Sequence, residues 1–285
     1  MKKSNTIVIL LTLFLVFGTT VAVAEDSQPA LRHGPEKGSL VIIGGGTIPD
    51  AIWDKIVELG GGKENARFVA VTNASLERGD QAHLKSVEPL RQRIGDANVT
   101  LFELKSIEEA NDEKNLEVLK NATGIFFCGG QQIRIADAYL DTLAQKEFHN
   151  VLARGGVIAG TSAGATIQGS IMGLNRKGMV IPAGSNAEGE LTRGFGFLRD
   201  SVIAQHLLTR NRQFNLVNFV KAFPQLLGIG LDESTAIVVI KDEFEVIGNS
   251  YVAIYGTGEA PFFFLKAGQK YDLKKHKTIK VQKNK

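Results

Sequence analysis

The chain has 285 residues, a formal net charge of +3 and one cysteine, Cys128. This length fits one large α/β domain or two small domains, and the near-balance of charge argues against nucleic acid or an anionic membrane as the main partner. A single cysteine excludes an intrachain disulfide, so the fold must depend on its hydrophobic core.

The first 24 residues have the pattern of a signal peptide. Lys2 and Lys3 precede an apolar stretch at 7–17, and Ala22-Val23-Ala24 reads as a small-residue cleavage site. The apolar stretch is shorter than the roughly 20 residues of a membrane span, although an uncleaved N-terminal anchor is an alternative. We therefore expect an exported protein, periplasmic or secreted, that is cleaved near Ala24 and keeps no stable membrane anchor.

Through the first half of the chain, apolar runs of strand length alternate with stretches of helical period. The apolar runs cover 40–43, 68–71, 99–102, 124–128 and 157–159, and the helical stretches cover 50–59, 81–94, 108–119 and 133–152. This spacing is typical of βαβ units, and buried parallel strands read as continuous apolar runs. We expect a three-layer α/β fold, in which a mostly parallel sheet is flanked by helices on both faces.

The pattern changes in the second half. A long polar excursion at 173–196 precedes a short strand at 202–203 and a helix at 211–223. Closely spaced apolar runs then follow at 227–231, 236–240, 244–247 and 252–255. We interpret these runs as extra strands at the sheet edge near the C-terminus. Residues 39–285 then form a single catalytic α/β domain after an extended lead segment at 25–38.

The sequence Gly160-Thr161-Ser162-Ala163-Gly164 contains a G-x-S-x-G motif directly after an apolar run. Glycines two residues before and two after a serine relieve backbone clashes in a sharp strand-to-helix turn, and the next backbone N–H can face an oxyanion. The motif therefore makes Ser162 a candidate nucleophile. The alternative is a chance match in a chain with 31 glycines that marks only a tight turn.

A serine nucleophile needs a general base, and among the five histidines His206 is placed best. It follows a short apolar strand, and Glu233 follows another, so each would lie at a strand end, as Ser162 does. The alternatives are a helix-capping role for His206 and turn chemistry for Asp232 and Glu233. The order Ser, His, Glu differs from the usual α/β-hydrolase order, but geometry and role define a triad.

The sequence offers no cofactor site. Gly44-Gly45-Gly46 follows the first strand, but Pro49 stands where the G-x-G-x-x-G nucleotide pattern needs a glycine. No cluster of His, Cys or Asp has the spacing of metal ligands. We therefore expect neither a metal nor an organic cofactor.

Four motifs in the same order give the chain a resemblance to cyanophycinases. They are GTSAGA at 160–165, FFCGGQQ at 126–132, Gln205-His206 with Arg210 and Arg212, and GIGLDESTAIV at 228–238. The similarity runs from about Leu40 to 268–272. Cyanophycinases belong, with dipeptidase E, to a family of serine peptidases. The resemblance therefore implies a flavodoxin-like fold of the class I glutamine-amidotransferase type.

The resemblance also implies roles for individual residues. Ser162 would be the nucleophile, His206 the base and Glu233 the acid that orients it. Backbone N–H groups of Gly130 and Ala163 would form the oxyanion hole. The residues expected to line the substrate pocket are Gln132, Gln205, Arg210 and Arg212.

The implied reaction is hydrolysis of cyanophycin, a poly-aspartate bearing arginine on each β-carboxyl, to β-Asp-Arg dipeptides through an acyl-enzyme. The partner is then a peptide or polymer rich in aspartate, and the protein could assemble as a homodimer. The alternatives are an isoaspartyl or aspartyl dipeptidase of the same family, and a non-catalytic peptide-binding protein on the same fold.

Two residues depart from the cyanophycinase pattern. Ala204 stands where an Asp usually precedes Gln-His, and Gln131 replaces the Asp of GGDQ. A carboxylate is the natural partner of a guanidinium, so these changes are expected to relax or alter specificity. The excursion at 173–196 and the two arginines nevertheless favour a cyanophycinase over dipeptidase E.

Overall fold

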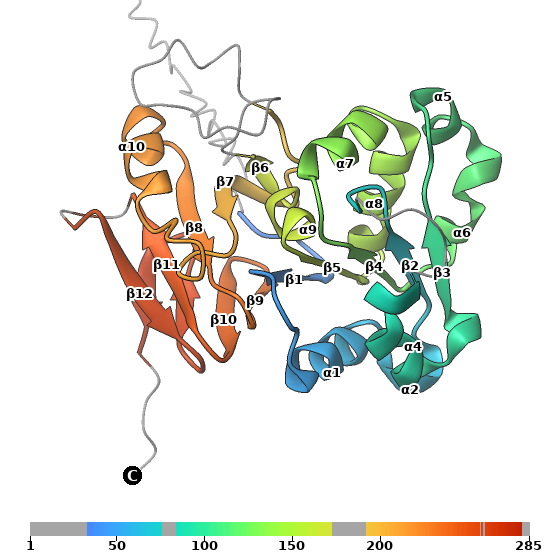
Figure 1. Ribbon diagram of the computed structural model, residues 1–285, viewed down its shortest axis with the longest axis horizontal. Helices are drawn as coiled ribbons and strands as arrows, with labels where there is room; N and C mark the ends of the chain where they lie inside the picture. The colour runs from blue at the N-terminus through green and yellow to red at the C-terminus, as the bar shows by residue number, and fades with distance from the viewer. Residues whose placement is uncertain (1–32, 76–83, 173–191, 257, 259, 281–285) are drawn as a thin grey trace, which may run out of the picture. The chain divides into compact units, whose positions relative to one another are not determined.

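A computed structural model describes residues 33–75, 84–172, 192–256, 258 and 260–280 (Figure 1). The predicted signal peptide, most of the lead segment and most of the polar excursion lie outside these residues. None of the helices in the described ranges is long and apolar enough to cross a membrane.

The first sheet has nine strands in the order β14-β13-β10-β9-β1-β5-β4-β2-β3. The strands from β1 to β5 pair in parallel, and β9 joins β1 in antiparallel fashion. The strands of this sheet are β1 (Ser39–Ile43), β2 (Phe68–Val71), β3 (Val99–Phe102), β4 (Gly124–Phe127), β5 (Val157–Thr161), β9 (Thr235–Ile240), β10 (Glu243–Gly248), β13 (Lys270–Asp272) and β14 (Lys277–Ile279).

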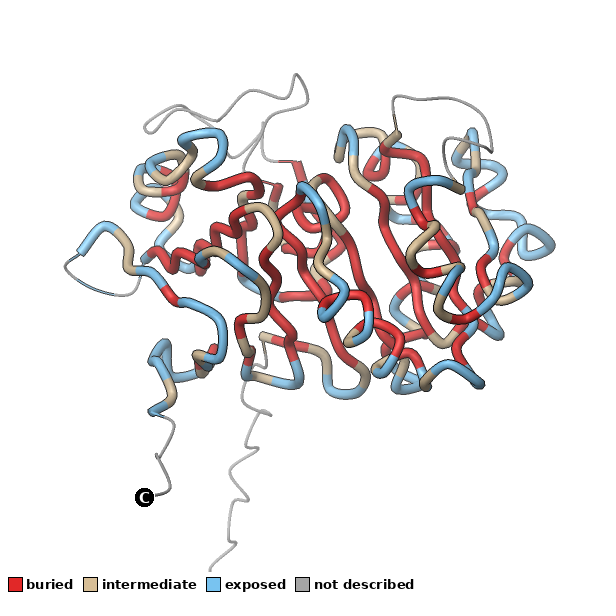
Figure 2. The backbone as a smooth tube through the Cα atoms, turned by 60° about the horizontal axis from the view of Figure 1, so that its bottom comes forward, coloured by how far each residue is buried: buried red, intermediate tan, exposed pale blue. Residues whose placement is uncertain are grey.

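Helices cover both faces of the parallel strands, which confirms the three-layer α/β prediction. Alternate residues of a strand point to opposite faces. Val41 and Ile43 of β1 accordingly pack with the helices on one face, and Leu40 and Ile42 pack on the other. The buried strands run through the middle of the molecule (Figure 2). The described helices are α1 (Asp50–Leu59), α2 (Gly62–Asn65), α4 (Glu88–Ile94), α5 (Ile107–Ala110), α6 (Glu117–Lys120), α7 (Gln132–Tyr139), α8 (Leu143–Ala153), α9 (Ala163–Thr166) and α10 (Asn215–Ala222), with 3₁₀ turns η1 (Asp96–Asn98) and η2 (Glu113–Leu116).

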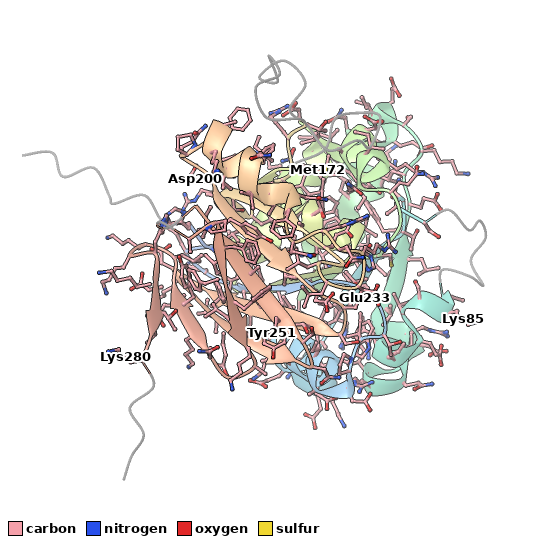
Figure 3. All side chains as sticks on the ribbon, turned by 60° about the vertical axis from the view of Figure 1, so that its left-hand side comes forward. Lys85, Met172, Asp200, Glu233, Tyr251 and Lys280 are labelled. Carbon is pink, nitrogen blue, oxygen red and sulfur yellow. The ribbon has the colours of Figure 1, made fainter. Side chains whose placement is uncertain are left out.

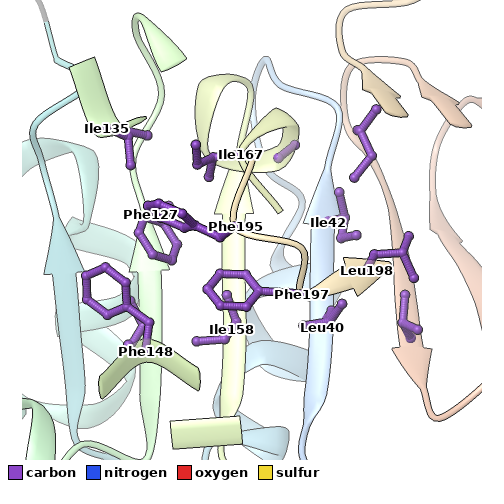
Figure 4. Close-up of a cluster of buried hydrophobic side chains, with 14 of the residues drawn as sticks. Leu40, Ile42, Phe127, Ile135, Phe148, Ile158, Ile167, Phe195, Phe197 and Leu198 are labelled. Carbon is purple, nitrogen blue, oxygen red and sulfur yellow. The ribbon is translucent and has the colours of Figure 1, made fainter. Parts of the chain in front are cut away.

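A second sheet takes up part of the C-terminal half, where the sequence predicted only additions to one sheet. It has five strands in the order β12-β11-β8-β7-β6, namely β6 (Gly169–Ile171), β7 (Leu198–Ala204), β8 (Leu227–Leu231), β11 (Tyr251–Tyr255) and β12 (Phe262–Lys266). Its inner face packs against the first sheet: Leu198 lies in the same buried cluster as Leu40 and Ile42 (Figure 4). An apolar run predicts that a strand exists, but it does not determine which strand pairs with it.

Three predicted helices are shorter or interrupted. The stretch at 133–152 divides into α7 and α8 because Asp141 has a positive φ and the Thr142 hydroxyl accepts a hydrogen bond from the N–H of Gln145, which caps α8. The stretch at 108–119 divides into α5, η2 and α6, and the Asp112 side chain caps η2 by accepting a hydrogen bond from the N–H of Lys114. The helix expected from Asn211 begins only at Asn215, since Asn211 itself has a φ of 52°.

The strand order fixes where a ligand can approach. The chain crosses from β1 to β2, adds β3 on the outer side, and then returns to β4 and β5, so the order reverses between β2 and β4. Ligands of open parallel sheets bind outside the carboxyl ends of the strands near such a reversal. The loops that follow β2 and β4 are joined there, because Gln131 donates its N–H to the carbonyl of Ala74 at 2.8 Å.

Candidate active site

Ser162 occupies the sharp turn between β5 and α9. Its backbone has φ 55° and ψ −110°, a conformation that non-glycine residues rarely adopt. The flanking glycines permit the turn: an added Cβ would lie 2.3 Å from the carbonyl oxygen of Gly164 at position 160, and 2.1 Å from that of Phe127 at position 164. The G-x-S-x-G motif therefore forms the strained elbow that its pattern predicts.

His206 lies just after the C-terminal end of β7, a strand of the second sheet, and its side chain faces this elbow. Its backbone N–H donates to the carbonyl of Gly44 at 2.9 Å, and its φ is 52°. The distance between Ser162 Oγ and His206 Nε2 is 2.9 Å. The ring therefore points at the serine hydroxyl and does not cap a helix.

Glu233 follows β8, the neighbour of β7, and completes a hydrogen-bonded chain. Its Oε1 lies 2.5 Å from Nδ1 of His206, while the His206 side chain is 7% exposed and that of Glu233 is 30% exposed. With Nδ1 donating to this carboxylate, Nε2 is left as the acceptor for the Ser162 hydroxyl. Glu233 lies among the loops between the sheets (Figure 3). The arrangement has the geometry of a nucleophile, a base and an orienting acid.

Burial lowers the pKa of His206 below its ordinary value. The hydrogen bond to Glu233 opposes this shift, and the positive charge of Arg210 adds to it. The neutral imidazole, which can accept a proton, therefore persists to a lower pH than in an exposed histidine.

Ala163 directly follows Ser162 at the start of α9, and Gly130 lies in the loop after β4. Gly129 is close to the nucleophile, since a Cβ added to it would lie 3.4 Å from Cβ of Ser162. Neither the N–H of Gly130 nor that of Ala163 donates to a carbonyl in the described part of the chain. Both remain available as oxyanion donors.

The four predicted pocket residues differ in burial and in hydrogen bonding. Arg212 is half-buried, and its Nη1 donates to Oε1 of Gln205 at 2.7 Å and to the Gln205 carbonyl at 3.1 Å. Arg210 is exposed in the same turn. Gln132 is the first residue of α7, and its side chain makes no hydrogen bond to another described residue. The structure therefore joins Gln205 with Arg212 through hydrogen bonds and shows no such bond from Gln132 to either residue.

The two departures from the cyanophycinase pattern lie at strand and helix ends. Ala204 is the half-buried last residue of β7, directly before Gln205. Gln131 is exposed and precedes α7. Neither position supplies a carboxylate.

Asp232 supports the site in a way that its sequence context did not reveal. Its Oδ1 accepts hydrogen bonds from the N–H groups of Leu208 and Thr209, at 2.9 and 3.0 Å, and its Oδ2 accepts one from Ser250. These bonds tie the turn after His206 to the segment that carries Glu233. They also lower the pKa of Asp232, although burial alone would raise it. The available signal in the sequence was an Asp placed between a buried apolar run and Glu233.

The chain is similar in sequence to known peptidases. The sequence model of peptidase family S51 matches residues 40–247. A cyanophycinase of Geminocystis herdmanii (strain PCC 6308) is 32% identical over 180 residues, which are 56% of this chain and 63% of that relative. A cyanophycinase of Synechococcus elongatus is 29% identical over 238 residues, 80% of this chain and 71% of the relative. The match thus spans just under two thirds of the first relative.

Two solved structures share the fold. A crystal structure of a peptidase from an acI-B1 Actinobacterium has a TM-score of 0.64 at 23% identity, covering 84% of this chain and 98% of that one. A putative peptidase E from Listeria monocytogenes EGD-e has a TM-score of 0.50 at 16% identity, covering 75% and 99%.

Proposed function

The chain belongs to peptidase family S51, and from this premise we propose that Ser162, His206 and Glu233 hydrolyse an aspartyl peptide bond through an acyl-enzyme. The observation that carries the proposal is the continuous hydrogen-bonded chain from the Ser162 hydroxyl through His206 to Glu233.

The reaction follows from the donors and acceptors of the site. Ser162 Oγ attacks the carbonyl carbon while its proton passes to Nε2 of His206, and the Glu233 carboxylate stabilises the resulting imidazolium. The N–H groups of Gly130 and Ala163 stabilise the oxyanion. The imidazolium then protonates the departing amine, which leaves an ester on Ser162. His206 next takes a proton from a water molecule that hydrolyses this ester.

The charges beside the site favour a substrate that carries carboxylates. Neither Arg210 nor Arg212 forms an ion pair with a carboxylate of the described residues, and the charge of Arg210 reaches both His206 and Arg212. Unpaired guanidinium groups are suited to binding carboxylates. The names of the relatives make cyanophycin the first candidate, and the lack of acids at positions 131 and 204 keeps an isoaspartyl dipeptide as the second.

The test is to incubate the purified protein with cyanophycin and, separately, with a panel of β-aspartyl dipeptides, and to identify products by mass. We expect β-Asp-Arg from the polymer; products from the dipeptides alone would favour the second candidate. A fluorophosphonate probe that labels wild-type protein but not Ser162→Ala would separate an enzyme from a binding protein. Absence of both labelling and products would refute the proposed activity.

Arg212 is expected to contribute to substrate binding. Arg212→Ala should lower kcat/KM by a factor that corresponds to roughly 2–4 kcal/mol of transition-state stabilisation, because the variant loses a partly buried guanidinium that binds a carboxylate. Arg212→Lys should recover only part of this loss, since lysine cannot form the bidentate contact. Labelling of Ser162 should persist in both variants. The control is Arg193→Ala, which removes an exposed arginine paired with Asp141. Equal kinetics in Arg212→Ala and the control would return Arg212 to a structural role.

The pH dependence should reflect the lowered pKa of His206. The base is active when neutral, so kcat/KM should fall with acidification around a midpoint below about 6.5, the ordinary pKa of histidine. Arg210→Gln removes a charge that lowers this pKa and should move the midpoint to higher pH. Steady-state pH profiles measure both effects. A rate that stays flat to pH 4 would exclude His206 as the base.

We further propose that the protein is exported and cleaved after Ala24, on the strength of the N-terminal sequence pattern. The intact mass of native protein should then place the N-terminus at Glu25. Membrane-bound protein that retains Met1 would support an anchor instead.

A further inference from the structure

The loop that follows β1, at 44–47, touches each segment that carries a residue of the site. Three successive carbonyl groups accept hydrogen bonds: Ile43 from the N–H of Ser162 at 3.1 Å, Gly44 from that of His206 at 2.9 Å, and Gly45 from that of Ser234 at 2.9 Å. Ser234, the neighbour of Glu233, also donates its hydroxyl to the carbonyl of Thr47 at 2.8 Å. The last residue of β1 and the loop that follows it thus fix the backbone of all three segments.

The same loop lies against the side chains of the base and the acid. A Cβ added at position 45 would lie 2.3 Å from Cε1 of His206, and its three nearest atoms would all belong to that ring. A Cβ added at position 46 would lie 2.6 Å from Oε2 of Glu233, and its three nearest atoms would all belong to that side chain. Carbon atoms in contact are normally about 3.5–4.0 Å apart.

We propose that Gly45 and Gly46 are positioning residues, whose missing side chains let the His206 ring and the Glu233 carboxylate pack directly on the loop. The inference rests on the proposed function of the site. A glycine run after the first strand can suggest phosphate binding. Here the run serves instead to align the base.

A positive φ alone does not account for these contacts. Gly45 and Gly46 have φ of 121° and 66°, but Gly155 and Gly196 have φ of 94° and 67° and would place a Cβ in open space. A positive φ strains an L-residue at all four positions, and the φ of Gly46 is close to that of Gly196. They differ in what a methyl group would meet, and this difference supplies matched controls.

A methyl group at position 45 should displace the imidazole by about 1 Å, because the ring must retreat to an ordinary carbon–carbon distance. The hydrogen bond from Ser162 Oγ to Nε2 is 2.9 Å long and would be lost or misaligned. Misplacement of a reacting group by about 1 Å can cost on the order of 10²-fold in rate.

The experiment compares Gly45→Ala with Gly155→Ala in the full-length protein, on the aspartyl substrate that wild-type protein cleaves. For Gly45→Ala we expect kcat to fall about 100-fold or more while KM stays within about three-fold. The rate of fluorophosphonate labelling should fall in parallel. The low-field proton resonance of a His Nδ1–H bonded to a carboxylate should shift or disappear. Gly155→Ala should match wild-type protein in kcat and in this resonance. Its melting temperature should fall, because the added side chain strains the backbone there as it does at position 45.

The second pair, Gly46→Ala and Gly196→Ala, decides the outcome if Gly45→Ala does not fold. Gly46→Ala should lower kcat about 10-fold or more and disturb the same resonance, because it displaces the carboxylate and not the ring. Gly196→Ala should do neither. Variants at 45 and 46 that fold and match their controls in kcat and in the resonance would overturn the inference. A wild-type protein with no activity and no labelling would instead refute the proposed function.

Discussion

Replacing Ser162 or His206 by alanine is expected to lower kcat by about 10⁴–10⁶-fold, the largest effect of any single substitution in this chain. Ser162→Ala removes the atom that forms the acyl-enzyme, and His206→Ala removes the acceptor 2.9 Å from its proton. Neither side chain contributes much apolar burial, so the variants should fold. Steady-state kinetics on the aspartyl substrate, with circular dichroism as a check on folding, measure the effect.

The double variant Ser162→Ala/His206→Ala gives a sharper test. Residues that act as one unit are strongly non-additive, so the double variant should be no slower than the slower single variant. His149→Ala is the matched control, since the His149 ring contacts the carbonyl of Phe195 and none of the three triad residues. If turnover in Ser162→Ala remains near that of wild-type protein, the nucleophile assignment is wrong.

Glu233→Gln is expected to lower kcat by about 10²–10⁴-fold. In the wild-type protein the carboxylate accepts a hydrogen bond from Nδ1–H of His206, with 2.5 Å between Oε1 and Nδ1. A glutamine amide can present its NH₂ group instead, which would favour the tautomer with the proton on Nε2, where the Ser162 proton must go. The variant also loses the charge that stabilises the imidazolium. Kinetics and the Nδ1–H resonance report on the two effects together.

The control for Glu233→Gln is Glu245→Gln, because Glu245 on β10 forms an exposed ion pair with Lys270 on β13. This control should keep wild-type kinetics. If Glu233→Gln changed only KM, Glu233 would be a substrate-binding residue and not the partner of the base.

The sequence predicts the parallel strands and the elbow well because both depend on local patterns. The apolar runs at 40–43 and 68–71 became β1 and β2 with little change, and the G-x-S-x-G motif requires its turn through clashes within a few residues. The breaks within predicted helices were missed because single residues decide them. Asp141 has a positive φ, and Asn211 has one as well.

The second sheet and the loop at 44–47 could not be predicted, since both depend on contacts between distant parts of the chain. Gly45 contacts His206 and Gly46 contacts Glu233, although each pair is more than 150 positions apart in the sequence. The glycine run was visible in the sequence, but its partners were not. Asp232 was missed for the same reason, because its hydrogen-bond donors lie on the turn at 207–209 and at Ser250.

The division of the site between two sheets bears on how activity appears during folding. Ser162 follows β5 of the first sheet, whereas His206 and Glu233 follow neighbouring strands of the second. The His–Glu pair can therefore form within one sheet, but the Ser–His contact requires the two sheets to dock. Contacts between distant segments form late and slowly. A newly made chain should thus remain without hydrolytic activity until this last step, so the regain of turnover in a refolding experiment marks sheet docking and not the formation of either sheet.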